Sequence, residues 1–422
     1  MNALTETWLQ GRSPAVAPWL TEFRQAQTQR LGLLAFPTPR TEGWQQTDLT
    51  GLKDWVWQPM GTVRADGDLA QLVATWLPPE AAGRAIALWG NQVLLRPTEL
   101  PPGVSWQLLS ETSATPDRFA QHTDATDYFA TLNGACVGEG VVLAVSSGVD
   151  AGIVAIAIVG TILPTADFPR VLVTVAPGAR LTLVEMAIGA DDRPYFRNSV
   201  TEIWLGEGAE CHHLLVQAEG EKAVQVAATA VSQGAHSQYH HQAIVLGGKI
   251  ARHNLWVRPT GEATITHLAG LALVGGDRLA DTHATLSLDY PHSYSRQRYK
   301  CAAGGRGRGI FHGKIAVGKA AQRTDAAQLS RGLLLSPAAR IHTEPQLEIL
   351  ADDVKCAHGA TVSQLDAEEL FYLRSRGLDP SGAIRLLVNG FAGEVLAQIA
   401  VPSLRTRLGK LAGDRLQSQI LG

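Results

Sequence analysis

The cysteine and histidine within residues 351–361, Ala-Asp-Asp-Val-Lys-Cys-Ala-His-Gly-Ala-Thr, are the side chains of this sequence best suited to bind a metal. Residues 346–350, just before, alternate polar and apolar side chains, as a half-buried strand does. If that strand continues, Cys356 and His358 point to the same face, because side chains two positions apart do so. A thiolate and an imidazole presented together suit a borderline or soft metal ion. We therefore predict metal ligands at Cys356 and His358, near the last edge of a sheet.

Two ligands do not complete such a site, since four are usual. The remaining ligands come either from distant parts of this chain or from another subunit. The four cysteines form no C-x-x-C pair, and we expect free thiols rather than disulfides. The other histidines that stand out are interpreted as core or turn residues, namely His212, His213, His240, His241, His283 and His292.

The composition is that of a globular protein with many turns. The 422 residues include 45% hydrophobic residues and 42 glycines, and the net charge is −3. This charge gives no reason to expect nucleic acid or an anionic membrane as a partner. The sequence contains neither a signal-peptide pattern at its start nor a run of 18 apolar residues, so we expect no membrane span and a cytoplasmic location.

Residues 1–140 are predicted to form an α+β region. Apolar residues at helical spacing indicate helix in residues 1–35, and short strands are expected within residues 85–110. A further helix is predicted over residues 117–134. Trp44, in a proline-containing loop, is expected to anchor that loop to the body of the protein.

Residues 141–365 are predicted to form a β-solenoid, because short Val/Ile/Leu/Thr runs alternate with turns that recur at a regular spacing. Turn glycines at positions 178, 208, 234 and 261 are separated by 30, 26 and 27 residues. A period of this size indicates stacked coils, each of which buries its apolar face only against its neighbours. The alternative is a large β-sandwich with regular hairpins.

Residues 366–422 are predicted to be helical. Asp366 resembles a helix cap, and Pro380 and Pro402 each occupy a first helical position. Apolar residues from Ile384 to Ile399 recur at helical spacing. These helices either cap the last coil or form a docking surface for another chain.

Motifs of common enzymes are weak or absent. Residues 313–320 approach a phosphate-binding loop, but Ala320 lacks the hydroxyl that binds magnesium and no helical pattern follows. Residues 290–324 hold eight basic and no acidic residues, which leaves phosphate or RNA binding as an alternative. A solenoid enzyme acting on carbohydrate is a second alternative, although the adjacent Asp352 and Asp353 would face opposite ways on a strand.

Several segments resemble the SufD family, the scaffold subunits of the Suf iron–sulfur cluster assembly system. The chain departs from the family at Ala357, where serine is common, and it diverges before residue 240. Besides residues 351–361, the matching segments are 40–44 (Arg-Thr-Glu-Gly-Trp), 308–313 (Arg-Gly-Ile-Phe-His-Gly), 324–328 (Thr-Asp-Ala-Ala-Gln), 333–336 (Leu-Leu-Leu-Ser), 345–349 (Pro-Gln-Leu-Glu-Ile) and 371–377 (Phe-Tyr-Leu-Arg-Ser-Arg-Gly).

The resemblance implies an N-terminal α+β region, a right-handed parallel β-helix and a C-terminal helical domain. It also implies a non-enzymatic scaffold that pairs with SufB through the β-helix edge near His358. An iron ion or nascent iron–sulfur cluster would be shared there with SufB. His358 matches the family's ligand, whereas the role of its neighbour Cys356 is less defined.

The resemblance further implies that the C-terminal helices, around Phe371, Leu387 and Phe391, bind the SufC ATPase, so this chain itself binds no nucleotide. Dimerisation of SufC would pull on these helices and open the edge at His358. The resemblance also allows a flavin to bind to the complex. The isolated subunit is expected to pair with itself through the same edge.

Overall fold

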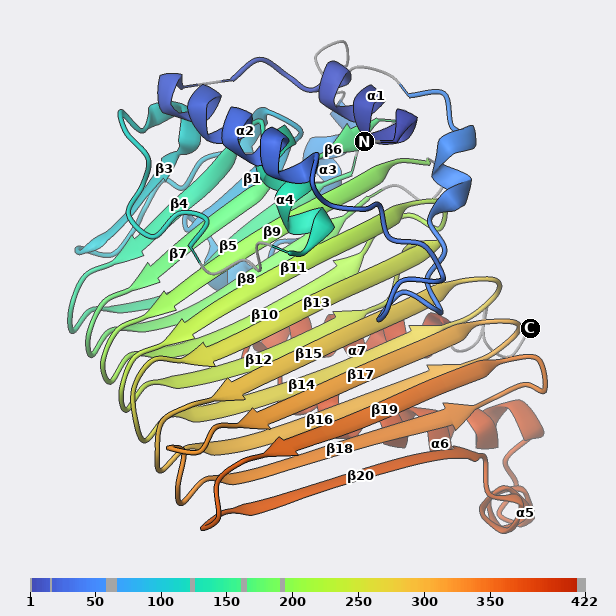
Figure 1. The fold of residues 1–422 in the computed structure, drawn as a ribbon. Helices are drawn as coiled ribbons and strands as arrows, with labels where there is room; N and C mark the ends of the chain where they lie inside the picture. The colour runs from blue at the N-terminus through green and yellow to red at the C-terminus, as the bar shows by residue number, and fades with distance from the viewer. Residues whose placement is uncertain are drawn as a thin grey trace.

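The chain winds into a parallel β-solenoid, in which two sheets face each other across a hydrophobic interior (Figure 1). This confirms the predicted solenoid, and the alternative of a sandwich built from hairpins is wrong, because the long strands pair in parallel with the next coil. The computed structural model describes residues 2–15, 17–57, 67–121, 126–160, 165–189 and 194–415.

Sheet A contains every second strand along most of the chain. Its strands, in spatial order, are β2 (Gln92–Leu95), β1 (Ala85–Trp89), β5 (Asp150–Val159), β8 (Arg180–Ile188), β10 (Glu210–Ala218), β12 (Gln238–Val245), β14 (Ile265–Val274), β16 (Tyr294–Ala303), β18 (Asp325–Leu334) and β20 (Lys355–Gln364).

Sheet B contains the strands between them. Its strands, in spatial order, are β19 (Arg340–Ile349), β17 (Arg308–Val317), β15 (Leu279–Leu288), β13 (Ile250–Pro259), β11 (Val224–Gln233), β9 (Phe196–Leu205), β7 (Arg170–Val175), β4 (Gly140–Val145) and β3 (Val104–Leu108), with β6 (Ala166–Asp167) also paired to β9.

The two sheets begin with short antiparallel strands. β2 pairs with β1 and β3 pairs with β4 in antiparallel fashion, and the pairs that follow along the solenoid are parallel. Because β1 and β3 extend the two sheets, residues before 140 contribute directly to the solenoid. The predicted division at residues 140 and 365 stays a prediction.

A recurring left-handed residue shapes the turns along one side of the solenoid. Gly178 and Gly208 have φ of 67° and 63°, and in later coils His236 and Ala263 take this place with φ of 60° and 55°. Each of these residues donates its backbone N–H to a carbonyl one coil further on, as Gly178 does to Glu207. The later turns therefore place the strained conformation two residues beyond the glycines at 234 and 261 that the repeat pattern had singled out.

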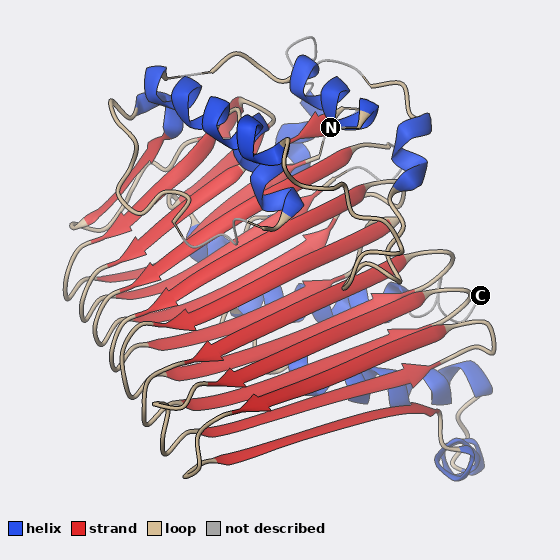
Figure 2. Cartoon of the chain, in the orientation of Figure 1, coloured by secondary structure: helices blue, strands red, loops and turns tan. Residues whose placement is uncertain are grey.

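Three N-terminal helices, α1 (Ala3–Gly11), α2 (Pro18–Leu31) and α4 (Tyr128–Cys136), cover the outer face of sheet B at its N-terminal end (Figures 1 and 2). Helix α3 (Gly67–Trp76) packs instead against β5 of sheet A. Trp8 stacks on Phe196 with ring centroids 4.5 Å apart. Trp44 is buried, as predicted, and lies against Phe129. The helical turns of this region are η1 (Thr50–Asp54), η3 (Pro79–Ala81) and η4 (Leu109–Glu111).

The helix predicted over residues 117–134 is shorter than expected. Residues 117–121 form turns, residues 122–125 lie outside the described part of the chain, and α4 begins after Asp127. The carboxylate of Asp127 accepts a hydrogen bond from the backbone N–H of Ala130 at 2.6 Å and so caps the helix. The predicted start of the helix at residue 117 was therefore wrong.

The C-terminal helices are α5 (Ala367–Ser375), α6 (Pro380–Leu396) and α7 (Pro402–Arg415). Helices α6 and α7 pack on the outer face of sheet A, whereas α5 contacts α6 and has no buried residue. Asp366 and Asp379 cap α5 and α6, as the sequence predicted. The apolar stripe of α6 lies against strands β14 and β16, and Val388 and Val395 belong to the hydrophobic cluster that contains Leu271 and Ala302.

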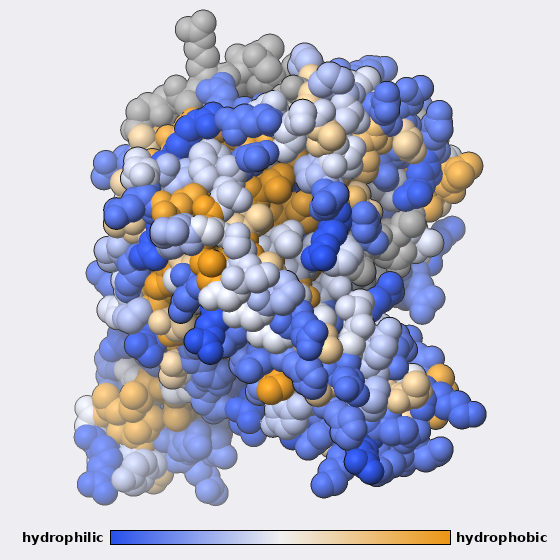
Figure 3. All heavy atoms as spheres, turned by 90° about the vertical axis from the view of Figure 1, so that its left-hand side faces the viewer, coloured by the Kyte–Doolittle hydropathy of each residue, from blue (hydrophilic) through white to orange (hydrophobic). Residues whose placement is uncertain are grey.

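None of the described helices is both long enough and apolar enough to cross a membrane. The side of the solenoid formed by turns is mainly hydrophilic, and its hydrophobic residues gather in separate patches (Figure 3).

A buried ion pair fastens α4 to sheet B. Two guanidinium nitrogens of Arg170 donate to Oε2 of Glu202 at 3.1 and 2.8 Å, and a third donates to Oδ1 of Asn133 in α4 at 3.0 Å. The side chains of Arg170 and Glu202 are only 1% and 0% exposed. Each charge therefore depends on the other for the interactions that water would otherwise supply.

We expect Arg170→Met to lower the free energy of unfolding by about 3–5 kcal/mol, because it leaves the Glu202 carboxylate buried without its partner. Urea denaturation measures this loss. The matched control is Arg96→Met, which breaks the exposed Arg96–Glu111 pair and should cost less than about 1 kcal/mol. Equal losses of unfolding free energy in the two variants would show that the buried ion pair stabilises the fold no more than the exposed pair does.

Candidate functional site

The solenoid ends in two unpaired strand edges. Within the described chain, β20 pairs only with β18 and β19 pairs only with β17, so each strand has one edge with no neighbour. These strands are ten residues long and lie at the lower end of Figure 1. Val362 on β20 is 42% exposed although it belongs to the inward-facing series. Among the described residues, no further coil covers this end of the interior.

Cys356 and His358 lie on β20, at this open end. Sequence reasoning placed them on a continuation of the strand at 346–350, and that was wrong: β19 ends at Ile349, the chain turns, and β20 begins in the opposite sheet. The two side chains still share a face through the register of β20. They pair with Ala326 and Gln328 of β18, which are both buried in the interior.

The two side chains differ in their exposure. Cys356 is half-buried and packs against the interior hydrophobic cluster, whereas His358 is exposed at the rim. Burial raises the pKa of the Cys356 thiol. The isolated subunit therefore holds Cys356 as the neutral thiol at neutral pH, and a metal or a cationic partner group is needed to favour the thiolate.

A column of amides leads to His358 from the coils below. Nε2 of Gln328 donates to Oε1 of Gln297 at 3.0 Å, and both side chains are buried. His358 occupies the next place in this column. Oε1 of Gln328 has no hydrogen-bond partner among the described residues. Gln328, the neighbour of His358 on the adjacent strand, therefore carries a carbonyl oxygen whose hydrogen-bonding capacity is unsatisfied among the described residues.

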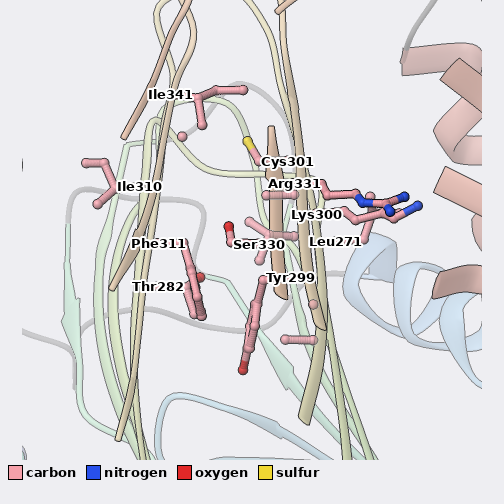
Figure 4. Close-up of a pocket in the computed structure, with 15 residues that line it drawn as sticks. Leu271, Thr282, Tyr299, Lys300, Cys301, Ile310, Phe311, Ser330, Arg331 and Ile341 are labelled. Carbon is pink, nitrogen blue, oxygen red and sulfur yellow. The ribbon is translucent and has the colours of Figure 1, made fainter. Parts of the chain in front are cut away.

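Aromatic side chains line the interior below the open end. Tyr299 of β16 and Phe311 of β17 stack with ring centroids 4.1 Å apart, and both point into the space between the sheets (Figure 4). Lys300 and Arg331 point the opposite way, towards the C-terminal helices (Figure 4). The two rings border a small cavity between the sheets, so the interior near the open end is not completely filled.

Cys356 and His358 do not belong to any cluster of three or more potential ligands in the described part of the chain. Two such clusters exist elsewhere, one formed by Glu210, His212 and His240 and the other by His312, His342 and Glu344. Among the described residues the pair at the rim therefore lacks a third donor nearby. Both sources expected for the remaining ligands, distant parts of this chain and another subunit, stay predictions.

Sequence reasoning missed both three-residue clusters. His212, His240 and His267 are spaced by 28 and 27 residues, and His283, His312 and His342 by 29 and 30. These spacings match the strand register for most of the histidines, because His212, His240 and His267 are direct neighbours on successive strands, and so are His283 and His312. His342 instead pairs with Ile310, and Glu344 takes the place beside His312. The signal was present in the sequence, but the histidines were considered one at a time.

The histidines interpreted as core or turn residues divide by face. His213 and His241 are buried in the interior, as expected, and Nε2 of His213 lies 3.2 Å from the Glu185 carboxylate. His212 and His240 lie half-buried on the outer face of sheet A. His283 and His312 stack on the outer face of sheet B, with ring centroids 4.5 Å apart.

Comparison with known proteins defines the class. Residues 159–391 match the family model described as "SUF system FeS cluster assembly, SufBD core domain". The match covers more than half of the chain and includes the strands of the open end. The chain belongs to this family, whose members assemble iron–sulfur clusters.

Individual relatives agree with this assignment. A SufBD family protein of Synechocystis is 37% identical over 94% of this chain and 91% of its own length. Protein ABCI7, chloroplastic, of Arabidopsis thaliana is 31% identical over 93% of this chain and 85% of its own length. The iron–sulfur cluster assembly protein SufD of Escherichia coli is 31% identical over 57% of each chain. These names confirm the resemblance to SufD that the sequence motifs indicated.

We expect Cys356 to be the first cysteine labelled by iodoacetamide under native conditions. Burial raises the pKa of Cys136, Cys211 and Cys301 to about 12. Cys136 and Cys211 are also buried, whereas Cys301 and Cys356 are half-buried, and the sulfur of Cys301 packs against Gly309. Because the pKa of Cys356 is also raised, its labelling should be slower than that of a free thiol at pH 7 and should accelerate with rising pH.

Mass spectrometry of digested protein identifies the labelled residue. Cys356→Ser should remove the early label and leave the three slower sites unchanged. Early labelling of Cys301 or Cys211 in its place would contradict the expected order of reactivity.

Proposed function

We propose that this chain is a non-enzymatic scaffold subunit for iron–sulfur cluster assembly, and that its open end pairs with a SufB-type subunit. The observation that carries the proposal is the position of His358 and Cys356 on β20, an unpaired strand at the open rim of the solenoid. A partner strand added to this edge would satisfy its backbone groups and cover the exposed interior. It would also bring further ligands beside the two donors.

The donors at the rim fit iron as a cargo. The neutral imidazole of His358 is a ligand for ferrous iron, and a thiolate supplies the softer ligand that iron–sulfur clusters prefer. His358 is exposed and therefore reachable by a group on another subunit. In this proposal His358 is the ligand from this chain, the partner provides a thiolate, and Cys356 is a second donor on the same face.

The C-terminal helices are proposed to bind a SufC-type ATPase. Phe371 and Tyr372 of α5 are 74% and 56% exposed, and Leu386 of α6 is 51% exposed. Apolar side chains this exposed, close together along the chain, are characteristic of an interaction surface. Of the residues first predicted for docking, Phe371 lies on this exposed surface, whereas Phe391 packs towards the solenoid and Leu387 is half-buried.

A specific linkage connects this helical surface to the solenoid near its open end. Nζ of Lys300 on β16 donates to the backbone carbonyl of Phe391 at 3.0 Å and lies 2.7 Å from the Glu394 carboxylate. The same ammonium lies 4.6 Å from the centre of the Phe391 ring. A force on α6 would therefore reach β16, two strands from β20 in sheet A.

The alternative function, phosphate or RNA binding by residues 290–324, has less support. Most of the basic side chains there lie within 4 Å of a carboxylate, which offsets their charge; the pairs are Arg296–Asp325, Lys300–Glu394, Arg306–Asp277, Lys314–Glu348 and Arg323–Asp353. The phosphate-loop-like residues 313–320 lie on β17 and the following turn, where no helix N-terminus is available to bind phosphate.

We expect His358→Ala to abolish cluster formation in cells that depend on the Suf system, while the complex with the SufB-type and SufC-type subunits still forms. Activity of a cluster-dependent reporter enzyme and co-purification of the subunits measure the two properties. The control is His236→Asn, an exposed turn histidine with φ of 60°, which asparagine tolerates. Full cluster formation with His358→Ala would refute the assignment of this ligand.

We expect Phe371→Asp to weaken binding of the SufC-type ATPase at least tenfold in isothermal titration calorimetry, because it places a charge in the apolar surface of α5. The thermal unfolding midpoint should change little, since Phe371 is 74% exposed in the free subunit. Leu33→Asp is the control, because Leu33 is 87% exposed but lies in the N-terminal region. Unchanged affinity would indicate that the helices only cap the solenoid.

A further inference from the structure

A second group of metal-type donors lies on the outer face of sheet B, in an open cavity beneath the loop that contains Trp44. The cavity is lined by residues 42–46 of this loop and by side chains of β15, β17 and β19. His312 comes from β17, and His342 and Glu344 come from β19. His358, in contrast, lies on sheet A in the inward-facing series. The two places therefore belong to different sheets and different faces.

The three donors converge on one point. Nδ1 of His312 lies 3.2 Å and Nε2 of His342 lies 3.5 Å from Oε2 of Glu344. The two imidazole rings are tilted by 50° with centroids 5.5 Å apart. Because the lone pair of an imidazole nitrogen lies in the ring plane, tilted rings can direct two lone pairs to one ion. One carboxylate oxygen and two ring nitrogens then form three ligands around a single position.

The other cluster does not have this arrangement. His212 and His240 stack with centroids 4.4 Å apart and an angle of 6° between the rings, and His267 continues the stack at 5.0 Å and 5°. Parallel stacked rings keep their lone pairs in separate parallel planes, so the in-plane lone pairs of two such rings do not meet at one ion. This cluster is therefore a ladder of like side chains on successive coils, and it serves below as the comparison.

Surrounding residues hold the donors in place. His283 stacks on His312 and lies 2.9 Å from the Asp281 carboxylate. Asp281 is itself held by Arg252, which donates to it at 2.5 Å. Nε2 of Gln346 donates to Oε1 of Glu344 at 2.8 Å, which leaves Oε2 directed at the imidazoles. Supporting hydrogen bonds of this kind are typical around metal ligands, because they fix the orientation of each donor.

The loop over the cavity is attached to the same support. Arg252 donates to the carbonyl of Gly43 at 2.8 Å and stacks on the ring of Trp44 at 3.8 Å. Thr47 donates to Asp281. The loop that roofs the cavity and the column that carries His312 are therefore one hydrogen-bonded unit.

The charges at the cavity also favour a cation. The carboxylate of Glu344 places a negative charge beside the two imidazoles, and Glu42 also lines the cavity. Lys314 also lines the cavity, but its ammonium lies 2.7 Å from the Glu348 carboxylate, which offsets its charge.

We propose that His312, His342 and Glu344 form a binding site for one divalent transition-metal ion of the borderline class, such as Fe²⁺, Co²⁺ or Zn²⁺. Two imidazoles and one carboxylate are a ligand set that these ions accept, with coordination positions left open to the cavity. The site is complete within this subunit and needs no partner chain. It is separate from the pair at Cys356 and His358 and does not depend on the function proposed for that pair.

Titration of the purified full chain with Co²⁺ tests the proposal, because visible d–d absorption reports coordination. We expect one Co²⁺ bound per chain at this site, without the near-ultraviolet sulfur charge-transfer band that Cys356 would add. A His358→Ala chain should bind this ion equally well. His342→Gln and Glu344→Gln should each weaken binding at least about tenfold. His342 is 50% exposed, so its replacement is not expected to unfold the protein.

The controls are His212→Gln and Glu210→Gln, which alter the stacked ladder on the other sheet with the same chemistry. They should leave Co²⁺ affinity unchanged, and circular dichroism should show that all four variants keep the wild-type fold. The proposal is overturned if the wild-type chain binds no Co²⁺. It is also overturned if His342→Gln and Glu344→Gln bind as tightly as wild type, or if affinity falls only in the ladder variants.

Discussion

Hydrogen bonding between each strand and the strand one coil further on is the constraint on which the rest of this structure depends. Strand β11 pairs with β9 over ten residues and with β13 over another ten, and neither pairing contains a shift in register. Since strand register decides which side chains face inward, a one-residue slip would expose the hydrophobic interior. The same rule leaves β19 and β20 with unpaired edges, because their partners would belong to a coil that the described chain does not form. The open end is therefore a direct consequence of how the solenoid is held together.

The register also explains why donor side chains gather in columns. A residue and its counterpart in the next coil, about one period later, become lateral neighbours, as His283 and His312 do. Columns of like residues arise in this way on both faces, and each has a different consequence. The Gln297–Gln328 column leads to the rim, the His212–His240 column stacks, and the column at His312 is interrupted because Glu344 takes the place beside it. A glutamate at one position of a histidine column therefore gives ligands that converge, where a further histidine would have continued the stack.

Much of the fold could be read from the sequence, because solenoid turns, helix caps and the apolar stripe of α6 are local patterns. Asp366 and Asp379 cap their helices as predicted. Features that depend on contacts between distant residues were predicted less well. The helix expected from Asp117 begins after Asp127, and β19 ends before Cys356. Likewise, Cys356 and His358 were found as neighbours in sequence, but His312, His342 and Glu344 were not. Their proximity is set by coil register, which the spacing of turn glycines only approximates.

The two ends of the solenoid differ, and this limits what the molecule can build. At the N-terminal end the outermost strands, β2 and β3, have four and five residues and run antiparallel to their neighbours, whereas β19 and β20 have ten each. Short edges of opposite direction are poor templates for another chain. If the open end pairs with another solenoid as proposed, that contact uses the long edges of both, and the short antiparallel strands at the far ends offer little edge for a further subunit. Such pairing would give a closed assembly of two solenoids rather than a filament.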